Sequence, residues 1–343
     1  MNLREFSKKV GLPVSTISKA LGGYKDVNIR TKNKIKTLAK KHNYSPNLHA
    51  KNLASRNILS VGFVLPTQDN FIHKLSLIEF IQNIHSELNK INIPVVMIFA
   101  KNKHDEIESY KKLINYHKVK LIILNDTKKN DERISFLDKY NMPYLTWGRT
   151  NKDKNSYTWI DEDVDYTTKI AIDYIISNGH KKICLISSMD ENNYFHLRQK
   201  SFSNYCKKNN ITFKKKQLLK LQADNFNLEK DKLIKFLKKN KETSLYLILS
   251  EQFLNIVLES FKETKKEIGR DVSIISFDSN LVDSLAPNIT TISQPVNDVK
   301  KNLTKLIINK LQNINSNNYY LYKSKLIKKK SVINIVKKTL IKN

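Results

Sequence analysis

The chain has 343 residues, with 61 Lys or Arg against 32 Asp or Glu, so its formal net charge is +29. This length suits a small module followed by a two-part core. Two cysteines exclude a disulfide framework, and no apolar run approaches the roughly 20 residues that span a bilayer. The charged start, Met1-Asn-Leu-Arg-Glu5, lacks the apolar region of a signal peptide. We therefore expect a cytoplasmic protein, nucleoid-associated when bound to DNA, with no membrane partner.

A helix-turn-helix pattern spans residues 3–22. The apolar positions of its first helix recur at spacings of three and four: Leu3, Phe6 and Val10. Gly11 can adopt the left-handed conformation that ends a helix, and Pro13 suits the first turn of the next one. The second helix has one apolar face: Ile17, Ala20 and Leu21. The pattern predicts a small all-α head.

The outward face of the second helix carries side chains suited to contact with base edges: Val14, Ser15, Ser18 and Lys19. Lys19 can donate to guanine, Ser15 is adaptable, and Val14 can touch a thymine methyl. Short helical hairpins also occur in proteins that never meet nucleic acid. However, residues 1–57 contain 13 Lys or Arg and only two acidic residues, a net charge of +11, which favours contact with phosphates.

Residues 3–22 resemble the N-terminus of the LacI/GalR family of bacterial transcriptional repressors. The resemblance continues through Asn28, the expected cap of a third helix, to Tyr44-Ser-Pro-Asn47. The family usually has Ser where this chain has Pro13 and Gly where it has Asn43; both replacements are physically tolerable. The resemblance implies double-stranded operator DNA as a partner. The expected DNA contacts are Leu3, Val14, Ser15, Thr16, Ser18, Lys19, Asn28, Asn47, Ala50 and Leu53.

Residues 47–57 resemble the hinge helix of the same family, with Ala50, Leu53 and Ala54 on one side. In the family this helix forms on DNA, pairs with its dimer mate and inserts a Leu between base steps of the minor groove. Leu53 occupies that position. A segment this short is barely stable as an isolated helix. The alternative is an ordinary interdomain linker.

After residue 56, short apolar runs alternate with helical patterns. Strands are expected at 58–65, 94–99, 121–124, 144–146, 182–187, 245–250 and 273–277. Helices are expected at 75–89, 106–117, 132–140, 165–178, 198–209, 229–240 and 254–266. This alternation is typical of βαβ units with parallel sheets, and its restart after Asp161 indicates two lobes.

Three core segments also resemble the family: residues 178–183, 269–278 and 288–295. The implied fold class is a small all-α helix-turn-helix head with a hinge helix, followed by a two-lobed α/β core similar to periplasmic binding proteins. The chain would cross three times between lobes and hold a ligand in the cleft. The expected parts are a head (1–46), a hinge (47–57) and a core (58–343). Lobe one would hold residues 58–161 and 290–322, and lobe two 162–289 and 323–343.

Two positions match the effector contacts of the family, Arg198 and Asp278. A guanidinium donates to adjacent hydroxyls and a carboxylate accepts from them, which suits a sugar or sugar derivative. Asp161 or Asp163 can add an acceptor, although one of the two is expected to cap the following helix. The expected effector-binding residues are Phe71, Trp147, Asp161, Arg198, Phe226, Ser250 and Asp278. For the three aromatic residues, core packing is the alternative.

The sequence leaves the identity of the effector undetermined. Many relatives have Asn-Asp where this chain has Ser250-Glu251, so the cleft could hold a different sugar, a phosphorylated metabolite or nothing small. Residues 144–150 resemble regulators of the oligosaccharide and galactoside type.

The resemblance implies a sequence-specific transcriptional regulator, a repressor, that binds a near-palindromic operator as a homodimer and responds to a small sugar-like effector. No nucleophile elbow, phosphate loop or metal cluster is present, so we expect no enzyme, cofactor or metal site. His180 is expected to cap carbonyls at a helix-to-strand turn. The end, Lys337–Asn343, is too short for a tetramerising coil. The rivals are an architectural DNA binder whose core senses nothing and a secreted sugar-binding protein, which the head contradicts.

Overall fold

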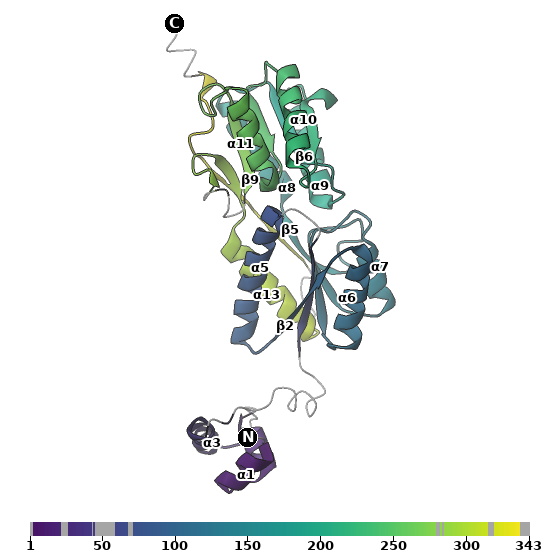
Figure 1. Ribbon diagram of the computed structural model, residues 1–343, viewed down its shortest axis with the longest axis vertical. Helices are drawn as coiled ribbons and strands as arrows, with labels where there is room; N and C mark the ends of the chain where they lie inside the picture. The colour runs from purple at the N-terminus through teal and green to yellow at the C-terminus, as the bar shows by residue number, and fades with distance from the viewer. Residues whose placement is uncertain are drawn as a thin grey trace. The chain divides into compact units, whose positions relative to one another are not determined.

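The computed structural model describes residues 3–21, 27–42, 44, 59–67, 71–278, 282, 285–314 and 319–336. The chain divides into two compact units, Met1–Ile58 and Leu59–Asn343 (Figure 1). No helix in the described ranges combines the length and the apolar character needed to cross a membrane.

The described part of the first unit forms three helices: α1 (Leu3–Val10), α2 (Val14–Leu21) and α3 (Ile29–Lys41). The first helix ends at Gly11, whose φ of +67° is a left-handed conformation that glycine adopts readily. The third begins after Asn28, whose side chain accepts a 2.9 Å hydrogen bond from the backbone N–H of Arg30, as a helix cap should.

A small apolar core joins these helices: Phe6, Ile17, Ala20, Ile35, Ala39 and Tyr44. Tyr44 stacks on Phe6 with ring centroids 4.3 Å apart. The Tyr of the expected Tyr-Ser-Pro-Asn motif therefore has a packing role, because it closes the core of the head.

The second unit contains two lobes, each with a six-stranded sheet in its described part. The first sheet has the order β11 (Tyr319–Tyr322), β5 (Thr158–Glu162), β4 (Tyr144–Trp147), β3 (Leu121–Leu124), β1 (Val61–Pro66) and β2 (Val95–Ala100). The second has the order β12 (Lys325–Ile327), β10 (Thr290–Ser293), β9 (Ser273–Asp278), β8 (Leu245–Ile248), β6 (Ile183–Ser188) and β7 (Leu218–Leu221). The strands are parallel except β12, which runs antiparallel to β10.

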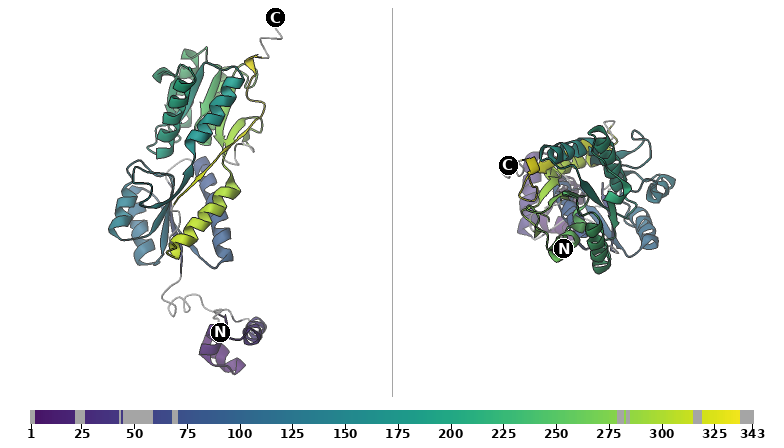
Figure 2. Two further views of the ribbon diagram at one scale, coloured as in Figure 1. Left: turned by 180° about the vertical axis from the view of Figure 1, so that it is seen from behind. Right: turned by 90° about the horizontal axis from the view of Figure 1, so that it is seen from above.

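Helices cover both faces of each sheet (Figures 1 and 2). In the first lobe, α5 (Phe71–Lys90) and α13 (Val296–Leu311) share one apolar core with the sheet, and α6 (Lys103–Asn115) and α7 (Glu132–Lys139) share the other. In the second lobe, α8 (Val164–Ser177) packs beside α9 (Asn193–Lys208), and α10 (Phe226–Lys239) beside α11 (Leu254–Glu263). Two short 3-10 helices complete it: η1 (Lys215–Gln217) and η2 (Glu251–Phe253).

The boundaries of the lobes differ from those expected. Residues 290–293 pair with β9 and belong to the second sheet, because Ile292 extends its apolar core. The chain returns to the first lobe only at α13. In addition, β5 continues to Glu162, so the first crossing follows that residue and not Asp161. Strands β5 and β7, together with the elements after β9, were not assigned individually from the sequence.

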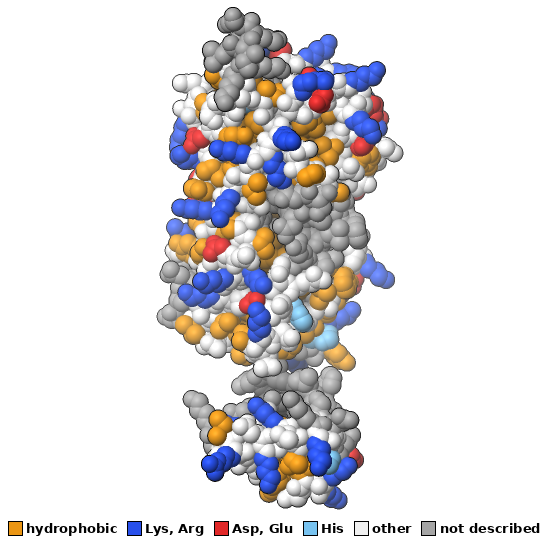
Figure 3. Space-filling view, turned by 90° about the vertical axis from the view of Figure 1, so that its left-hand side faces the viewer, with side chains coloured by type: hydrophobic (Ala, Val, Ile, Leu, Met, Phe, Trp, Pro, Cys, Tyr) orange, Lys and Arg blue, Asp and Glu red, His pale blue; other side chains and the backbone are white. Residues whose placement is uncertain are grey.

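Basic side chains are spread over the face of the core seen in Figure 3, with hydrophobic patches between them. This distribution agrees with a solvated basic surface, in which each Lys or Arg is surrounded by water.

Candidate ligand cleft and nucleic-acid interface

A cavity lies between the two lobes of the core, where the carboxyl ends of strands from both sheets meet. From the first sheet it is lined by residues at the ends of β3, β4 and β5: Asn125, Asp126, Trp147, Gly148, Asp161 and Glu162. From the second lobe it is lined by residues on α9, after β8 and near the end of β9: Tyr194, Arg198, Ser250, Glu251 and Phe277. Polar groups and aromatic rings thus converge on one hollow, the usual composition of a small-molecule site.

Arg198 lies in this cleft, as expected, but its guanidinium is already held by protein groups. Its Nε and Nη2 each lie 2.9 Å from Glu162 Oε2, and Nη1 donates to the Leu249 carbonyl at 2.7 Å. The other oxygen of Glu162 accepts from the Ser324 hydroxyl at 2.7 Å. Burial alone would lower the pKa of Arg198, but the charge of Glu162 raises it. The ion pair joins the two lobes, since Glu162 belongs to β5 and Arg198 to α9.

Asp161 lines the same cleft from the first lobe. Its Oδ2 accepts from Arg149 Nε at 2.7 Å and from the Arg149 backbone N–H at 3.1 Å. Burial raises the pKa of Asp161, and the Arg149 charge offsets only part of that rise. Asp163 has the other expected role: its side chain accepts from the Tyr166 N–H and caps α8.

The aromatic residues expected to bind a sugar differ in their position relative to the cleft. Trp147 lines the cleft and stacks on Phe80, with ring centroids 3.7 Å apart. Phe226 does not line it. That residue begins α10 after the edge strand β7, far along the sheet order from β9, and is 37% exposed. Phe71 begins α5 and Asp278 ends β9, but the side chains of both lie outside the described part of the chain.

His180 is not a cap for the end of α8. Its Nε2 lies 3.0 Å from the Ile333 carbonyl and its Nδ1 lies 2.9 Å from the Ser244 hydroxyl. The carbonyl can only accept, so Nε2 carries the proton of a neutral ring. His180 therefore ties the C-terminal segment to the second sheet. Among the described residues, no group of three or more His, Cys, Asp or Glu is placed to hold a metal ion.

The exposed face of α2 carries the side chains expected to read DNA. Ser15, Ser18 and Lys19 are exposed, as is Val14 (39%), whereas Thr16 is half-buried. Leu3 is half-buried against the apolar core of the head. Helix α2 therefore separates a packed face from a polar face of the kind that a recognition helix presents. Three expected contacts, Asn47, Ala50 and Leu53, lie outside the described residues, as does the whole hinge segment.

Comparisons with known proteins agree with this arrangement. Residues 172–332 match the family described as periplasmic binding protein-like domain. The chain is 29% identical to the HTH-type transcriptional regulator RafR of Escherichia coli over 202 residues, 59% of this chain and 60% of that protein. It is 23% identical to the HTH-type transcriptional regulator MalR of Clostridium butyricum over 343 residues, 98% of this chain and 100% of that protein. The alignment to AglR of Rhizobium meliloti spans 56% of that regulator.

A solved structure of the lac repressor dimer bound to operator and the anti-inducer ONPF matches with a TM-score of 0.80. That match covers 97% of this chain and 99% of the repressor at 18% identity, so it concerns the fold. The chain therefore shares the fold of the lac repressor, which is the fold that the resemblance to the LacI/GalR family implied. A CelR–cellobiose complex is also similar in fold, with a TM-score of 0.70 at 16% identity over 96% of this chain and 99% of that one.

Several residues that line the cleft were not predicted from the sequence, above all Glu162, Asn125, Asp126 and Tyr194. For Asn125-Asp126 a signal was present, because the pair directly follows the apolar run of β3. Glu162 could not be identified by its position in a strand, because β5 was not recognised as a strand.

Proposed function

We propose that this chain is a transcriptional regulator, a repressor, that binds a near-palindromic operator as a homodimer and changes its operator affinity when a sugar-like molecule occupies the cleft. One observation carries the proposal: the same chain combines an exposed polar face on α2 with a cleft lined by Arg198, carboxylates and stacked aromatic rings. We further propose that it acts in the cytoplasm, associated with the nucleoid when bound to DNA, and that it has no catalytic step.

Operator binding is tested with the full chain at physiological salt. A genome-wide footprint of bound DNA should return a near-palindromic motif, because a two-fold dimer reads a two-fold site. On that motif, Lys19→Ala should weaken binding about tenfold if it contacts a base. The exposed Lys8→Ala on α1 is the matched control. No preference for any palindrome over random competitor would overturn the proposal.

The charges around the cleft favour an uncharged sugar over a phosphorylated metabolite. Among the described lining residues the cationic side chains are Arg198 and Lys300, and each is already paired with a carboxylate: Glu162 for Arg198, and Glu87 for Lys300 at 3.1 Å. A phosphate group bound in the cleft would lie near these carboxylates, and both cations would already be neutralised by them. Hydroxyl groups can still exchange hydrogen bonds with these paired ions, and the Trp147–Phe80 stack offers an apolar platform.

A thermal shift screen tests the sensor function. The probes are galactose, sucrose, raffinose, maltose, cellobiose and glucose 6-phosphate. Saturable stabilisation by an uncharged sugar is expected, about 2.7 kcal/mol when the sugar is present at about 100 times its Kd. Trp147→Leu should abolish it, whereas Phe226→Leu, outside the cleft, should not.

The same sugar should change operator affinity about 5–150-fold in a gel shift, the usual range of such coupling. If sugars stabilise the chain but leave operator binding unaltered, the regulatory part of the proposal fails. If none of the probes binds, the chain is better described as an architectural DNA binder.

A further inference from the structure

The segment between β3 and α7 carries two sets of contacts. At its start, Asn125 and Asp126 line the ligand cleft. Directly after them, the Thr127 carbonyl accepts from the backbone N–H of Asn193 at 2.8 Å, and Lys128 forms an isolated antiparallel bridge with Asn192. One short segment of the first lobe therefore touches both the ligand site and the second lobe.

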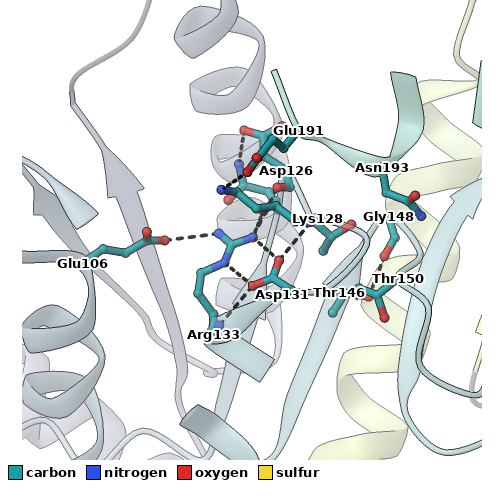
Figure 4. Close-up of polar contacts among 12 residues, drawn as sticks. Glu106, Asp126, Lys128, Asp131, Arg133, Thr146, Gly148, Thr150, Glu191 and Asn193 are labelled. Atoms are coloured by element: carbon teal, nitrogen blue, oxygen red, sulfur yellow. Dashed lines mark hydrogen bonds and ion pairs between the residues drawn. The ribbon is translucent and has the colours of Figure 1, made fainter. Parts of the chain in front are cut away.

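Side chains strengthen the contact between the lobes at this point (Figure 4). Lys128 Nζ lies 2.9 Å from Glu191 Oε2, and Asn193 Nδ2 donates to the Arg149 carbonyl at 2.8 Å. The neighbouring turn approaches closely, since a Cβ on Gly148 would lie 2.5 Å from Thr127 Oγ1. The segment is thus enclosed on the side of the second lobe and on the side of β4.

Arg133, the second residue of α7, holds this segment from inside the first lobe (Figure 4). Its Nη2 donates to the carbonyls of Asn125 at 2.8 Å and Asp126 at 3.3 Å. The same guanidinium binds Asp131 at 2.7 and 2.9 Å and Glu106 at 3.2 Å. Asp131 in turn accepts from the Lys128 N–H at 3.0 Å. The buried guanidinium of Arg133 thereby fixes both ends of the segment.

The backbone between the two carbonyls is strained. Asp126 has a φ of +49°, in the left-handed region that costs free energy for a residue with a Cβ. Such a conformation persists when the surroundings over-determine it. Arg133 supplies that restraint, because it binds the carbonyl before Asp126 and the carbonyl of Asp126 itself.

We infer that Arg133 is a positioning residue for the ligand cleft: without touching the ligand, it sets the direction in which Asn125 and Asp126 face it. The inference rests on the proposed function, because it presupposes a ligand in this cleft. Lysine cannot replace Arg133, since a single ammonium group cannot bind two carboxylates and two carbonyls in one plane.

The first test compares Arg133→Lys with Tyr110→Phe. Tyr110, on α6, donates to the same Glu106 at 3.2 Å, so its removal disturbs the same buried network from another helix. The probe is the uncharged sugar of the thermal shift panel that stabilises the wild-type chain most. Titration calorimetry well below the unfolding temperature should show at least tenfold weaker binding for Arg133→Lys and less than twofold change for Tyr110→Phe. Amide hydrogen exchange should increase in residues 125–131 of Arg133→Lys alone.

A second pair of variants keeps the Arg133 network intact. Asp126→Gly and Asp126→Ala both remove the carboxylate, but only alanine disfavours the left-handed backbone. If backbone direction matters, Asp126→Ala should bind the same sugar at least fivefold more weakly than Asp126→Gly.

The outcomes separate the two proposals. Unchanged affinity in folded Arg133→Lys, an equal loss in Tyr110→Phe, or equal affinities of the two Asp126 variants would overturn the positioning role and leave the proposed function standing. If no uncharged sugar binds the wild-type chain, the sensor function fails and this inference fails with it.

Discussion

The buried ion pair Arg198–Glu162 lines the cleft. Two charges removed from water lose their hydration, so further hydrogen bonds to such a pair stabilise it. Here the Leu249 carbonyl accepts from Arg198, and the Ser324 hydroxyl donates to the second oxygen of Glu162. Arg198 was expected from the resemblance as a ligand contact, but its orientation is set by Glu162.

Glu162→Gln should destabilise the core strongly. It leaves the buried guanidinium of Arg198 without its counter-charge, which costs about 3–5 kcal/mol of unfolding free energy in comparable cases. Urea unfolding at neutral pH measures the loss. Glu242→Gln is the control, because its ion pair with Lys182 is exposed and should contribute nothing measurable. Equal effects of the two substitutions would contradict this account of the pair.

The burial of His180 predicts that the free energy of unfolding depends on pH. Burial lowers the pKa of His180 below its usual value of about 6.5. Between that lowered pKa and about 6.5 the unfolded chain binds a proton that the folded chain does not, so stability falls as pH drops through this window and is level above it. Unfolding should be followed from about pH 7.5 to about pH 5.5. His180→Gln should flatten this part of the profile, whereas the exposed His117→Gln should leave it unchanged; the reverse result would show that other groups cause it.

At the scale of elements, the helices and strands whose apolar residues recur at a regular spacing were recognised from the sequence. In α2, the spacing of Ile17 and Ala20 separated the buried face from the exposed one, and both residues are buried. Strand β3 was placed at residues 121–124, as observed, because a continuous apolar run is typical of a strand buried on both faces. Strand β5 was missed because Asp161 and Glu162 interrupt its apolar pattern. These carboxylates are buried only because Arg149 and Arg198, from other elements, neutralise them.

The hinge expected at residues 47–57 gives a prediction at this scale. If Leu53 wedges between base steps, Leu53→Ala should weaken operator binding and reduce the bend in the DNA. Both units should stay folded, because the apolar core in the described part of the head is formed by residues 6–44, and Leu53 follows these residues and precedes the second unit. Gel shifts and a circular permutation assay measure the two effects. Ser55→Ala is the control within the same segment, and an unchanged affinity of Leu53→Ala would count against the wedge.

At the scale of the whole molecule, the proposed homodimer needs a surface, and the edge of the first sheet is the best candidate. Strand β2 ends the order of the described strands, and its side chains Met97 and Phe99 are 40% and 55% exposed. An exposed apolar edge strand is a place where another chain associates.

Phe99→Lys should therefore shift the chain from dimer to monomer at micromolar concentration, as measured by sedimentation. The added charge would have to be desolvated on association. Operator affinity should fall as well, since a monomer reads half of a palindrome. Tyr116→Lys, at an 82% exposed aromatic residue on the C-terminal end of α6, is the control. A dimer that tolerates Phe99→Lys would place the interface elsewhere.

The resemblance of the sequence to the LacI/GalR family placed Arg198 near the cleft. The sequence by itself determined the local features: the helix-turn-helix head and the alternation of helices and strands. These follow from periodicity and turn chemistry, which act between neighbours in the chain. The tertiary structure alone decided that residues 290–293 join the second lobe, that Glu162 holds Arg198, and that Arg133 fixes the segment 125–131. Each of these depends on groups far apart in sequence, whose burial and pairing are settled only when the two sheets have formed.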